Sequence, residues 1–339
     1  MNKLKPRLVR QIFVLLLILF LGILIFKEII PYLSGILGAI TLYVLMRKWM
    51  EKLVNRGWKK SIAAAVLMIG SFIGILIPIA LIIVMLSSKI GQAVSNSEKV
   101  IEAVKNQADK LEHYLGYNIT ENVDSSSITT WISSNLQSLA GGTFNATIAI
   151  GIMYFLLYYM LINRKEMQDH VNEYIPLDEE NIILIGKESD TSVRSNAIGI
   201  PLVALIQGVI ALIGYFIFSA PDPLFWFVIT VIGSMIPFIG TALGIIPVTL
   251  LMLSQGQDWQ AIAILIYGFT VVGATDNLVR LYILEKLSSV HPLITLFGVV
   301  VGVPLFGFIG LIFGPLLISL FLLILKIYKK EYGNEYDNL

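Results

Sequence analysis

The sequence predicts an all-α integral membrane protein, a polytopic helical bundle embedded in a lipid bilayer, and two observations predict this fold. Hydrophobic residues make up 56% of the 339 residues, and charged residues make up only 14%, against about 25% in soluble domains. Several uncharged runs also reach the roughly 20 residues that a helix needs to cross hydrocarbon. Because these runs are continuously apolar, they do not fit the short alternating segments of a transmembrane barrel.

Composition also excludes several classes of function. The chain has no cysteine, so it has no disulfide, no thiolate nucleophile and no cysteine-ligated metal. Its three histidines (His113, His170 and His291) lie far apart without a ligand spacing. The net charge is +1, and no nucleic-acid-binding motif is present. We therefore predict no metal, no cofactor, no nucleic-acid partner and no catalytic residues, and hence a protein that is not an enzyme.

Residues 1–86 are predicted to form three transmembrane helices, at about 11–26, 31–46 and 62–86. The N-terminus resembles a signal peptide, but no small-residue cleavage site follows, so a retained first span is the better interpretation. Basic residues precede the first span and fill the loop between the second and third, which places both in the cytoplasm. These are Lys3, Lys5, Arg7 and Arg10, then Arg47, Lys48, Lys52, Arg56, Lys59 and Lys60. Pro78 is expected to kink the third span.

Residues 87–143 form the largest polar insertion and would lie outside the cell. Apolar residues recur there every three or four positions, as on one face of a helix, which predicts two amphipathic helices. The insertion is either a connector hairpin or a surface that binds a partner.

Residues 144–195 are predicted to hold the fourth span and a cytoplasmic helical loop broken at Pro176. The C-terminal transmembrane core then occupies 196–327, followed by a cytoplasmic tail at 328–339. Its first span, about 197–218, carries Gln207 and Gly208 near the middle. A glutamine within a span serves either as an interhelical hydrogen-bonding group or as a ligand contact.

Two longer apolar segments in this core, 224–253 and 291–325, are interrupted by proline and glycine in a similar order. As one straight helix the first would be roughly 45 Å long, against a hydrocarbon core of about 30 Å. We predict repeated units, each a span followed by a broken, hairpin-like segment. The gate candidates are Pro237, Gly240, Gly244 and Pro247 in the first segment, and Pro304, Gly307, Gly310 and Pro315 in the second.

Each broken segment either crosses once or turns back as a hairpin. Loop charge favours hairpins, one dipping from outside and one from inside, because that arrangement places Arg280 and Lys286 in the cytoplasm. Broken helices expose backbone groups that can coordinate ions or polar solutes. The alternative is that the glycines only allow close helix packing.

Asp276, Asn277 and Arg280 follow the uncharged run 260–275 and are, with Gln207, the candidates for transport and coupling. Ionisable residues inside a span mark functional sites by default. Counted from Trp259, however, Asp276 lies roughly 25 Å along a helix, near the inner boundary of the hydrocarbon core. An interfacial ion pair that anchors the helix end is therefore the competing interpretation.

The C-terminal half resembles the autoinducer-2 exporter family of bacterial membrane proteins, and the resemblance extends over most of the chain. The matching residues are Gln207-Gly208, Ile236-Pro237-Phe238-Ile239-Gly240, Pro247, Asp276-Asn277 with Arg280, His291-Pro292-Leu293, Gly302, Gly307, Gly310 and Gly314-Pro315. Leu281 departs from the pattern, in which a proline usually follows the arginine.

The resemblance implies a pentameric homo-oligomer in the bacterial inner or plasma membrane that performs secondary transport. We expect an exporter of a small polar solute or signalling molecule, coupled to a proton or sodium gradient. A sodium–proton antiporter is the alternative within the same class. A membrane scaffold that binds a partner through residues 87–143 is the alternative from another class.

Overall fold

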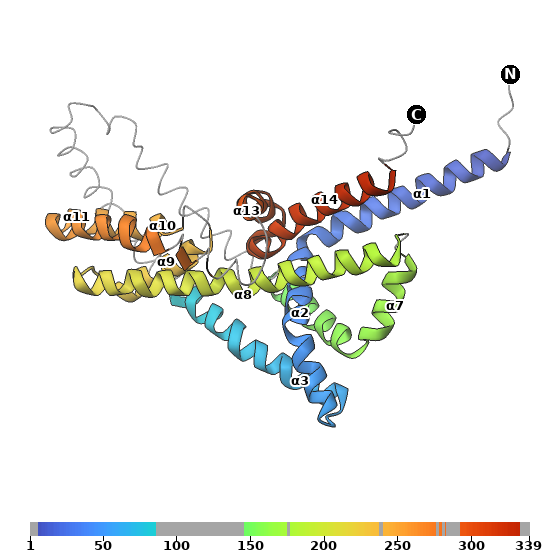
Figure 1. The fold of residues 1–339 in the computed structure, drawn as a ribbon, viewed down its shortest axis with the longest axis horizontal. Coiled ribbons are helices and arrows are strands. Elements are labelled where there is room, and N and C mark those ends of the chain that lie inside the picture. Colours follow the sequence, from blue (N-terminus) through green and yellow to red (C-terminus); the bar gives the residue numbers. More distant parts are fainter. Residues whose placement is uncertain are drawn as a thin grey trace, which may run out of the picture.

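The structure, a computed structural model, describes residues 6–85, 146–174, 177–236, 240–275, 278–279, 282 and 292–332. All elements in this part of the chain are helical, so the predicted all-α fold is confirmed (Figure 1). The first half contains α1 (Pro6–Ile29), η1 (Ile30–Tyr32), α2 (Leu33–Asn55), α3 (Lys60–Ser71), η2 (Phe72–Leu76), a helix at Ala146–Ile162 and α7 (Arg164–Tyr174). The second half contains α8 (Glu179–Ile217), α9 (Pro223–Ser234), α10 (Ala242–Ser254), α11 (Asp258–Tyr267), η4 (Gly268–Val272), α13 (Pro292–Phe306), η5 (Gly307–Ile309) and α14 (Gly310–Tyr332).

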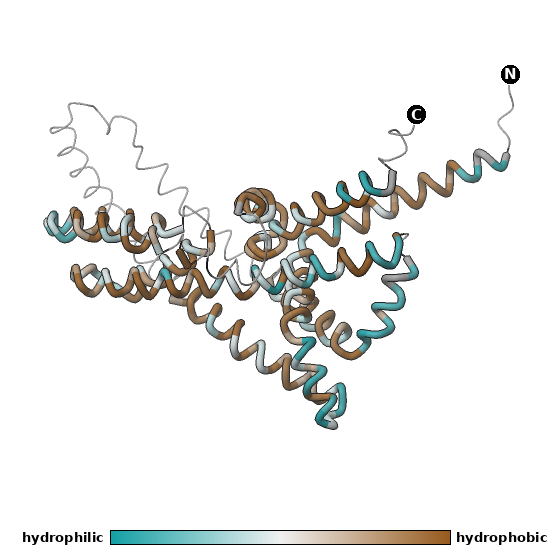
Figure 2. Tube along the Cα trace, in the orientation of Figure 1, coloured by the Kyte–Doolittle hydropathy of each residue, from teal (hydrophilic) through white to brown (hydrophobic). Residues whose placement is uncertain are grey.

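Several of these helices are long and apolar enough to cross a membrane. Within the described ranges five helical runs meet that condition, and a sixth does so if the bent pair 146–162 and 164–170 is counted as one span. Apolar residues cover the lengths of the helices, and polar residues collect on α7, at the α2–α3 turn and at the outer ends of α1 and α14 (Figure 2). The chain is therefore a multi-pass membrane protein.

The N-terminal helices overlap the predicted spans, but α2 runs on to Asn55, so Arg47, Lys48 and Lys52 lie in this helix and not in the predicted loop. Pro31 lies in η1, where the chain bends between α1 and α2. Along α1 the apolar side chains from Ile12 to Phe26 are exposed. The third helical run, 60–85, contains a π-helical turn at Phe72–Leu76, immediately before Pro78. Since a proline cannot donate the helical hydrogen bond, a local change of helical pitch is the usual way to absorb one.

Helix α8 is the element that connects the two halves of the fold. It is 39 residues long and contacts α2, α9, α11 and α14. The predicted boundary between residues 195 and 196 lies inside this continuous helix. Glu179 and Glu180 occupy its first turn, where acidic side chains complement the helix dipole. Pro201 is the one proline in its length, and neighbouring helices compensate such a residue within a membrane bundle.

Charged and polar contacts attach the first half of α8 to α2. Arg47 forms an ion pair with Asp190 at 2.8 Å, and Arg194 donates a hydrogen bond to the carbonyl oxygen of Val44 at 2.5 Å. Beside these contacts, a core of side chains from α2, α3, the helix 146–162, α8 and α14 is buried. The contact between α2 and α8 is therefore stabilised both by polar pairs and by apolar packing.

The chain reverses direction within both Pro/Gly-interrupted segments. In the first segment Gly233 near the end of α9 lies against Gly240, and α9 packs on α10. In the second segment Gly298 of α13 lies against Gly314 and Pro315 of α14. A straight helix would separate residues 298 and 314 by about 24 Å, so the helical run 293–330 is folded back on itself.

Several predicted features lie outside the described residues. These are the whole insertion at 87–143, the predicted break at Pro176, Pro237, the charged group Asp276, Asn277 and Arg280, and most of the tail at 328–339.

Candidate functional site

The buried face of α8 carries a polar residue in the middle of the fold. Residues Val203, Ala204, Gln207, Ala211 and Tyr215 are buried and recur every three or four positions, which defines one helical face. Gln207 is 0% exposed, and it is the large polar side chain of this face. The face is otherwise apolar at this level, so the glutamine amide is held in a low-dielectric environment.

Neither amide atom of Gln207 has a hydrogen-bond partner among the described residues. The hydroxyl oxygen of Ser234, at the end of α9, is also buried and also has no hydrogen-bond partner among the described residues. Gly208, next to Gln207 on α8, packs on Val231 of α9, and Ser234 follows Val231 by one helical turn. Leaving a buried polar group unpaired costs about 1–3 kcal/mol, so such groups in native proteins call for a ligand, an ion or a water.

Several neighbouring polar groups have hydrogen-bond partners, unlike Gln207 and Ser234, although Asp190 Oδ1 and Arg194 Nε, nearer the start of α8, are also buried without a partner among the described residues. Thr230 donates its hydroxyl hydrogen to the Trp226 carbonyl oxygen at 2.7 Å. The Tyr215 hydroxyl lies 2.7 Å from the Thr230 hydroxyl oxygen, and since the Thr230 hydrogen is already used, Tyr215 is the donor. Tyr267 likewise donates to the Ile210 carbonyl oxygen at 2.8 Å.

Glycines allow close contacts between α8, α9 and α10 around these groups. A β-carbon at Gly208 would clash with Val231, and one at Gly244 would clash with Thr230. Gly233 and Gly240 face each other with no room for a side chain on either. Three helices can therefore approach closely enough to enclose polar groups without large side chains between them.

The two Pro/Gly-interrupted segments meet on α8 next to this polar region. Ile200 of α8, Val299 of α13 and Leu311 of α14 form a small buried cluster. Met235 and Ile236, from the turn that follows α9, pack on it, as does Val303 of α13. Residues from both reversals of the chain thus converge on one turn of α8, and Ile200 is two turns from Gln207 on the same face. We call this apolar cluster the junction.

A second polar residue of α8 lies on the other side of the junction. Asn196 is buried, and its amide nitrogen lies 3.4 Å from the Ile312 carbonyl oxygen of α14 and 3.5 Å from the Ser192 hydroxyl oxygen. Along the buried face of α8, Ile200 and its apolar contacts therefore lie between two amide side chains, those of Asn196 and Gln207. An apolar constriction flanked by polar groups is an arrangement that can bind a polar solute and also obstruct its passage.

The predicted site residues are distributed unevenly around the junction. Gln207 lies beside it, and Gly240 and Gly244 shape the α9–α10 contact. In the second segment Gly310 packs against Gly302, whereas Gly307 has a positive φ of 65° and no close neighbour. Pro247, Pro304 and Pro315 lie inside α10, α13 and α14 respectively. Pro237, Asp276, Asn277 and Arg280 lie outside the described residues.

Sequence reasoning did not select Ser234, Asn196 or the junction cluster. Ser234 follows Thr230 by one helical turn in an otherwise apolar stretch, so the sequence could have indicated that both lie on one buried face. No sequence pattern could have indicated the convergence on Ile200, because aliphatic residues are common throughout the chain.

These observations define a class: a multi-pass helical membrane protein with two reversing broken segments that meet at a buried polar site. Comparison with known proteins agrees with that class. The family model described as AI-2E family transporter matches residues 13–330. The chain therefore belongs to the AI-2E transporter family, which confirms the resemblance seen in the sequence.

Relatives in distant organisms are similar over most of their length. A protein of Aquifex aeolicus is 24% identical over 242 residues, which are 70% of this chain and 69% of the relative. A protein of Mycobacterium tuberculosis is 21% identical over 311 residues, covering 86% of this chain and 80% of the relative. A protein of Pyrococcus horikoshii is 23% identical over 334 residues, covering 93% and 87%. The printed names of all three begin "Putative transport protein".

Proposed function

We propose that the chain is a secondary transporter that exports a small polar solute, driven by a proton or sodium gradient. The solute would bind beside the junction, at the Gln207 amide and the Ser234 hydroxyl. Membership of a transporter family supports membrane transport in general, and the site described here supports the polar character of the solute.

The observation that carries this proposal is the unpartnered amide of Gln207. A glutamine that served only to join helices would donate to or accept from a neighbouring helix, as Tyr267 does. Gln207 instead has both amide atoms free among the described residues, although the side chain is fully buried. A polar solute would supply the missing partners and would offset the cost of burying the amide.

The junction explains why this site suits transport better than static binding. It is built from residues of both reversals of the chain and from α8, which both segments contact. Movement of either segment relative to α8 would separate the apolar residues at the junction and open a path past it. Alternating access in transporters commonly uses such movement of one repeat against another around a fixed site.

Gln207→Leu tests the site directly, because leucine has a similar volume and no polar atom. Solute efflux and proton and sodium flux would be measured separately in proteoliposomes with imposed ion gradients. We expect the flux of the substrate to fall by about tenfold or more, which corresponds to the loss of one hydrogen bond worth about 1.4 kcal/mol. The thermal stability in detergent should be unchanged or higher, since an unpaired polar group has been removed.

The matched control is Thr249→Val on α10. Thr249 is also buried, but its hydroxyl donates to the Ile245 carbonyl oxygen of its own helix at 2.8 Å. This variant should transport normally. If Gln207→Leu instead lowers the melting temperature and leaves flux intact, the glutamine is a structural contact and the proposed site is wrong.

Asp276 remains the proposed coupling carboxylate, with Arg280 as its charge partner. A cation can compete with the guanidinium for the carboxylate, which would couple ion binding to movement of the helix. Asp276→Asn should then uncouple solute efflux from the ion gradient. Ion exchange without any solute in the same assay would favour the sodium–proton antiporter instead.

A further inference from the structure

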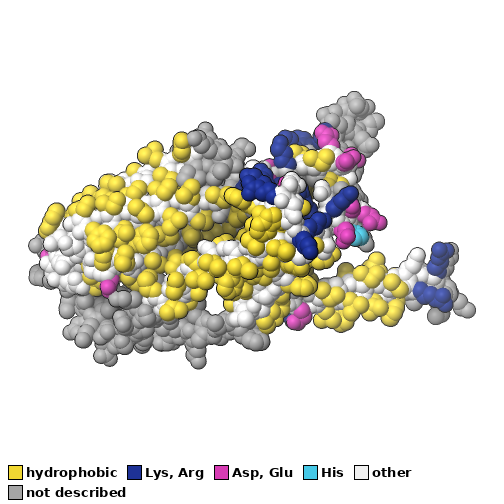
Figure 3. Space-filling model, turned by 90° about the horizontal axis from the view of Figure 1, so that it is seen from below, with side chains coloured by type: hydrophobic (Ala, Val, Ile, Leu, Met, Phe, Trp, Pro, Cys, Tyr) yellow, Lys and Arg dark blue, Asp and Glu magenta, His cyan; other side chains and the backbone are white. Residues whose placement is uncertain are grey.

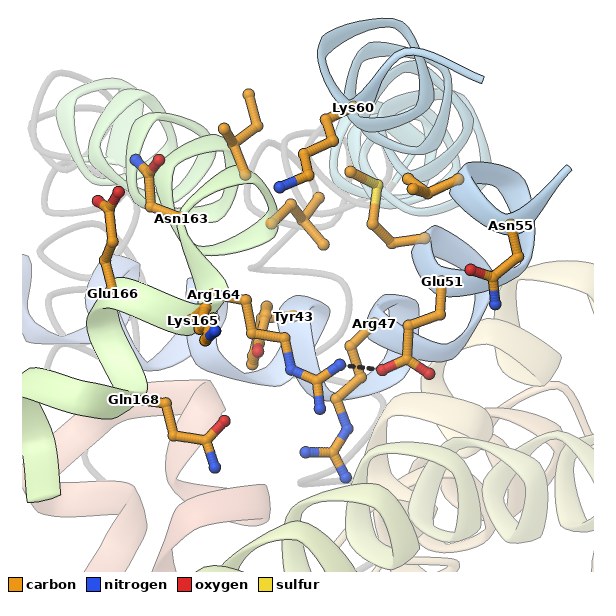
Figure 4. A pocket seen from close by; sticks show the side chains of 14 residues that line it. Tyr43, Arg47, Glu51, Asn55, Lys60, Asn163, Arg164, Lys165, Glu166 and Gln168 are labelled. Carbon is orange, nitrogen blue, oxygen red and sulfur yellow. Dashed lines mark hydrogen bonds and ion pairs between the residues drawn. The ribbon is translucent and has the colours of Figure 1, made fainter. Parts of the chain in front are cut away.

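A second site of different chemistry lies at the charged end of the molecule. A cavity of about 510 Å³ opens between the last turns of α2, the start of α3, the end of the helix 146–162 and the start of α7 (Figure 4). Lysine and arginine side chains gather at this end with acidic side chains among them, whereas hydrophobic side chains dominate the rest of the visible face (Figure 3). The cavity shares no residue with the junction, and Gln207 does not line it.

The lining of this cavity carries an excess of positive charge. Its cations are Arg47, Lys60, Arg164 and Lys165, and its acids are Glu51 and Glu166. Two of the cations are already committed: Arg164 pairs with Glu51, and Arg47 pairs with Asp190 behind the cavity. Among the described residues no ion pair holds Lys60 or Lys165, and Figure 4 shows Lys60 reaching toward the cavity from α3. Two ammonium groups are therefore available for an anion.

Two helix N-termini add to this preference for an anion. Lys60 is the first residue of α3 and Arg164 the first residue of α7, and both line the cavity. The backbone N–H groups in the first turn of a helix have no partner within that helix, and the helix dipole places partial positive charge there. Phosphate groups are common ligands of such positions.

Part of the remaining wall of the cavity is apolar, beside the polar side chains of Tyr43, Asn55, Asn163 and Gln168, and a soluble anion would not require this apolar part. Met50, Val54, Leu161 and Ile162 line it together with the charged residues. On the nearby surface Trp49 is 62% exposed and Trp58 is 43% exposed. Tryptophan is enriched at the level of lipid headgroups, so these two residues place the cavity at the membrane–water interface.

We propose that this cavity binds the phosphate of an anionic membrane phospholipid. Lys60 and Lys165 would contact the phosphate directly, and the first methylenes of the lipid would pack on Leu161 and Ile162. The helix 146–162 and α7 meet here at a bend of 91°, so a bound lipid would connect α2 and α3 to both sides of that bend. Basic pockets between helices at the membrane surface are a recognised form of lipid recognition.

Native mass spectrometry of the detergent-solubilised protein tests this proposal. The wild-type protein should retain phosphatidylglycerol in preference to phosphatidylcholine when both are supplied in mixed micelles. Inorganic phosphate at millimolar concentration should not displace the lipid. Equal retention of the two lipids, or displacement by phosphate alone, would overturn the assignment to a lipid headgroup; neither measurement depends on a variant.

Variants then locate the site. Lys60→Gln with Lys165→Gln should weaken phosphatidylglycerol binding by about tenfold or more, because both ammonium groups that would contact the phosphate are removed. The arginine pair Lys60→Arg with Lys165→Arg should retain binding. Lys326→Gln with Lys329→Gln removes the same charge from α14, outside the cavity, and should change retention little. If the control variant loses as much phosphatidylglycerol binding as the variant at Lys60 and Lys165, the lipid is held by general attraction to a positive surface, and the proposed site is wrong.

Discussion

The two Pro/Gly-interrupted segments share a pattern of residues but differ in length and in how they attach to α8. The arms of the first, α9 and α10, are 12 and 13 residues long, or about 18 and 20 Å. In the second, α13 has 15 residues and α14 has 23, so α14 alone reaches about 35 Å. Only α14 is therefore long enough to cross a hydrocarbon core of about 30 Å unaided.

The difference arises after the second proline of each segment. Beyond Pro247 the apolar run ends at Ser254, and Gly256 adopts a positive φ of 75° in the turn that follows α10. Beyond Pro315 apolar residues continue up to Lys326. Similar break motifs thus specify the reversal, and the sequence that follows decides whether the returning helix spans the membrane.

Attachment to α8 also differs between the segments. The first is held by a hydrogen bond between Tyr215 and Thr230 and by the close contact at Gly208. The second is held by the apolar junction and by Asn196, whose amide lies near the Ile312 carbonyl oxygen. In addition the two arms of the second segment contact each other through four glycines: Gly298 and Gly302 on α13, and Gly310 and Gly314 on α14. We infer that the second segment is the more rigid unit internally.

The largest expected effect comes from disturbing that internal contact. A β-carbon at Gly314 would overlap the backbone of Gly298, which cannot move aside as a side chain can. Gly314→Ala should therefore destabilise the protein by about 3 kcal/mol or prevent its folding. Gly186→Ala on α8 meets no atom within 4 Å and should instead stabilise by about 0.5–1 kcal/mol. Thermal unfolding in detergent gives the melting temperature of each variant. Similar melting temperatures for the two variants would show that Gly314 is not in tight contact with Gly298.

A smaller effect is expected at the attachment of the first segment. Thr230→Val leaves the buried Tyr215 hydroxyl without its acceptor, at a cost of about 1–3 kcal/mol. Tyr215→Phe removes the donor but leaves Thr230 bonded to Trp226, so it should cost only about 0.5–1.5 kcal/mol. The double variant should cost less than the sum of the two. Strict additivity in the melting data would show that the two hydroxyls do not interact.

The fold was largely predictable because membrane crossing imposes long uncharged runs that stand out in the sequence. The spans at 11–26 and 62–86 correspond to α1 and to the helical run 60–85. The continuity of α8 across residue 195 was less visible, since the polar residues before it suggested a separate loop. Arg47 and Asp190 show why: Arg47, assigned to a cytoplasmic loop, and Asp190, in the polar stretch before residue 195, pair with each other between α2 and α8.

The candidate site was predictable only in part. Gln207 is conspicuous because an amide within an apolar run is costly unless it has a use. The absence of a partner for that amide, and the unpartnered Ser234 hydroxyl, depend on which helix faces meet and could not be read from one sequence. The same holds for the convergence of Met235, Ile236 and Val303 on Ile200.

We propose that the polar site beside the junction of the two segments opens to each side of the membrane in turn. The chain has no natural cysteine, so a single Ser234→Cys variant can be probed with a charged, membrane-impermeant thiol reagent. We predict labelling from both sides, in right-side-out and in inverted vesicles, and no labelling of Thr249→Cys from either. A Ser234→Cys variant that is inert from both sides, or reactive from one side only, would contradict the account.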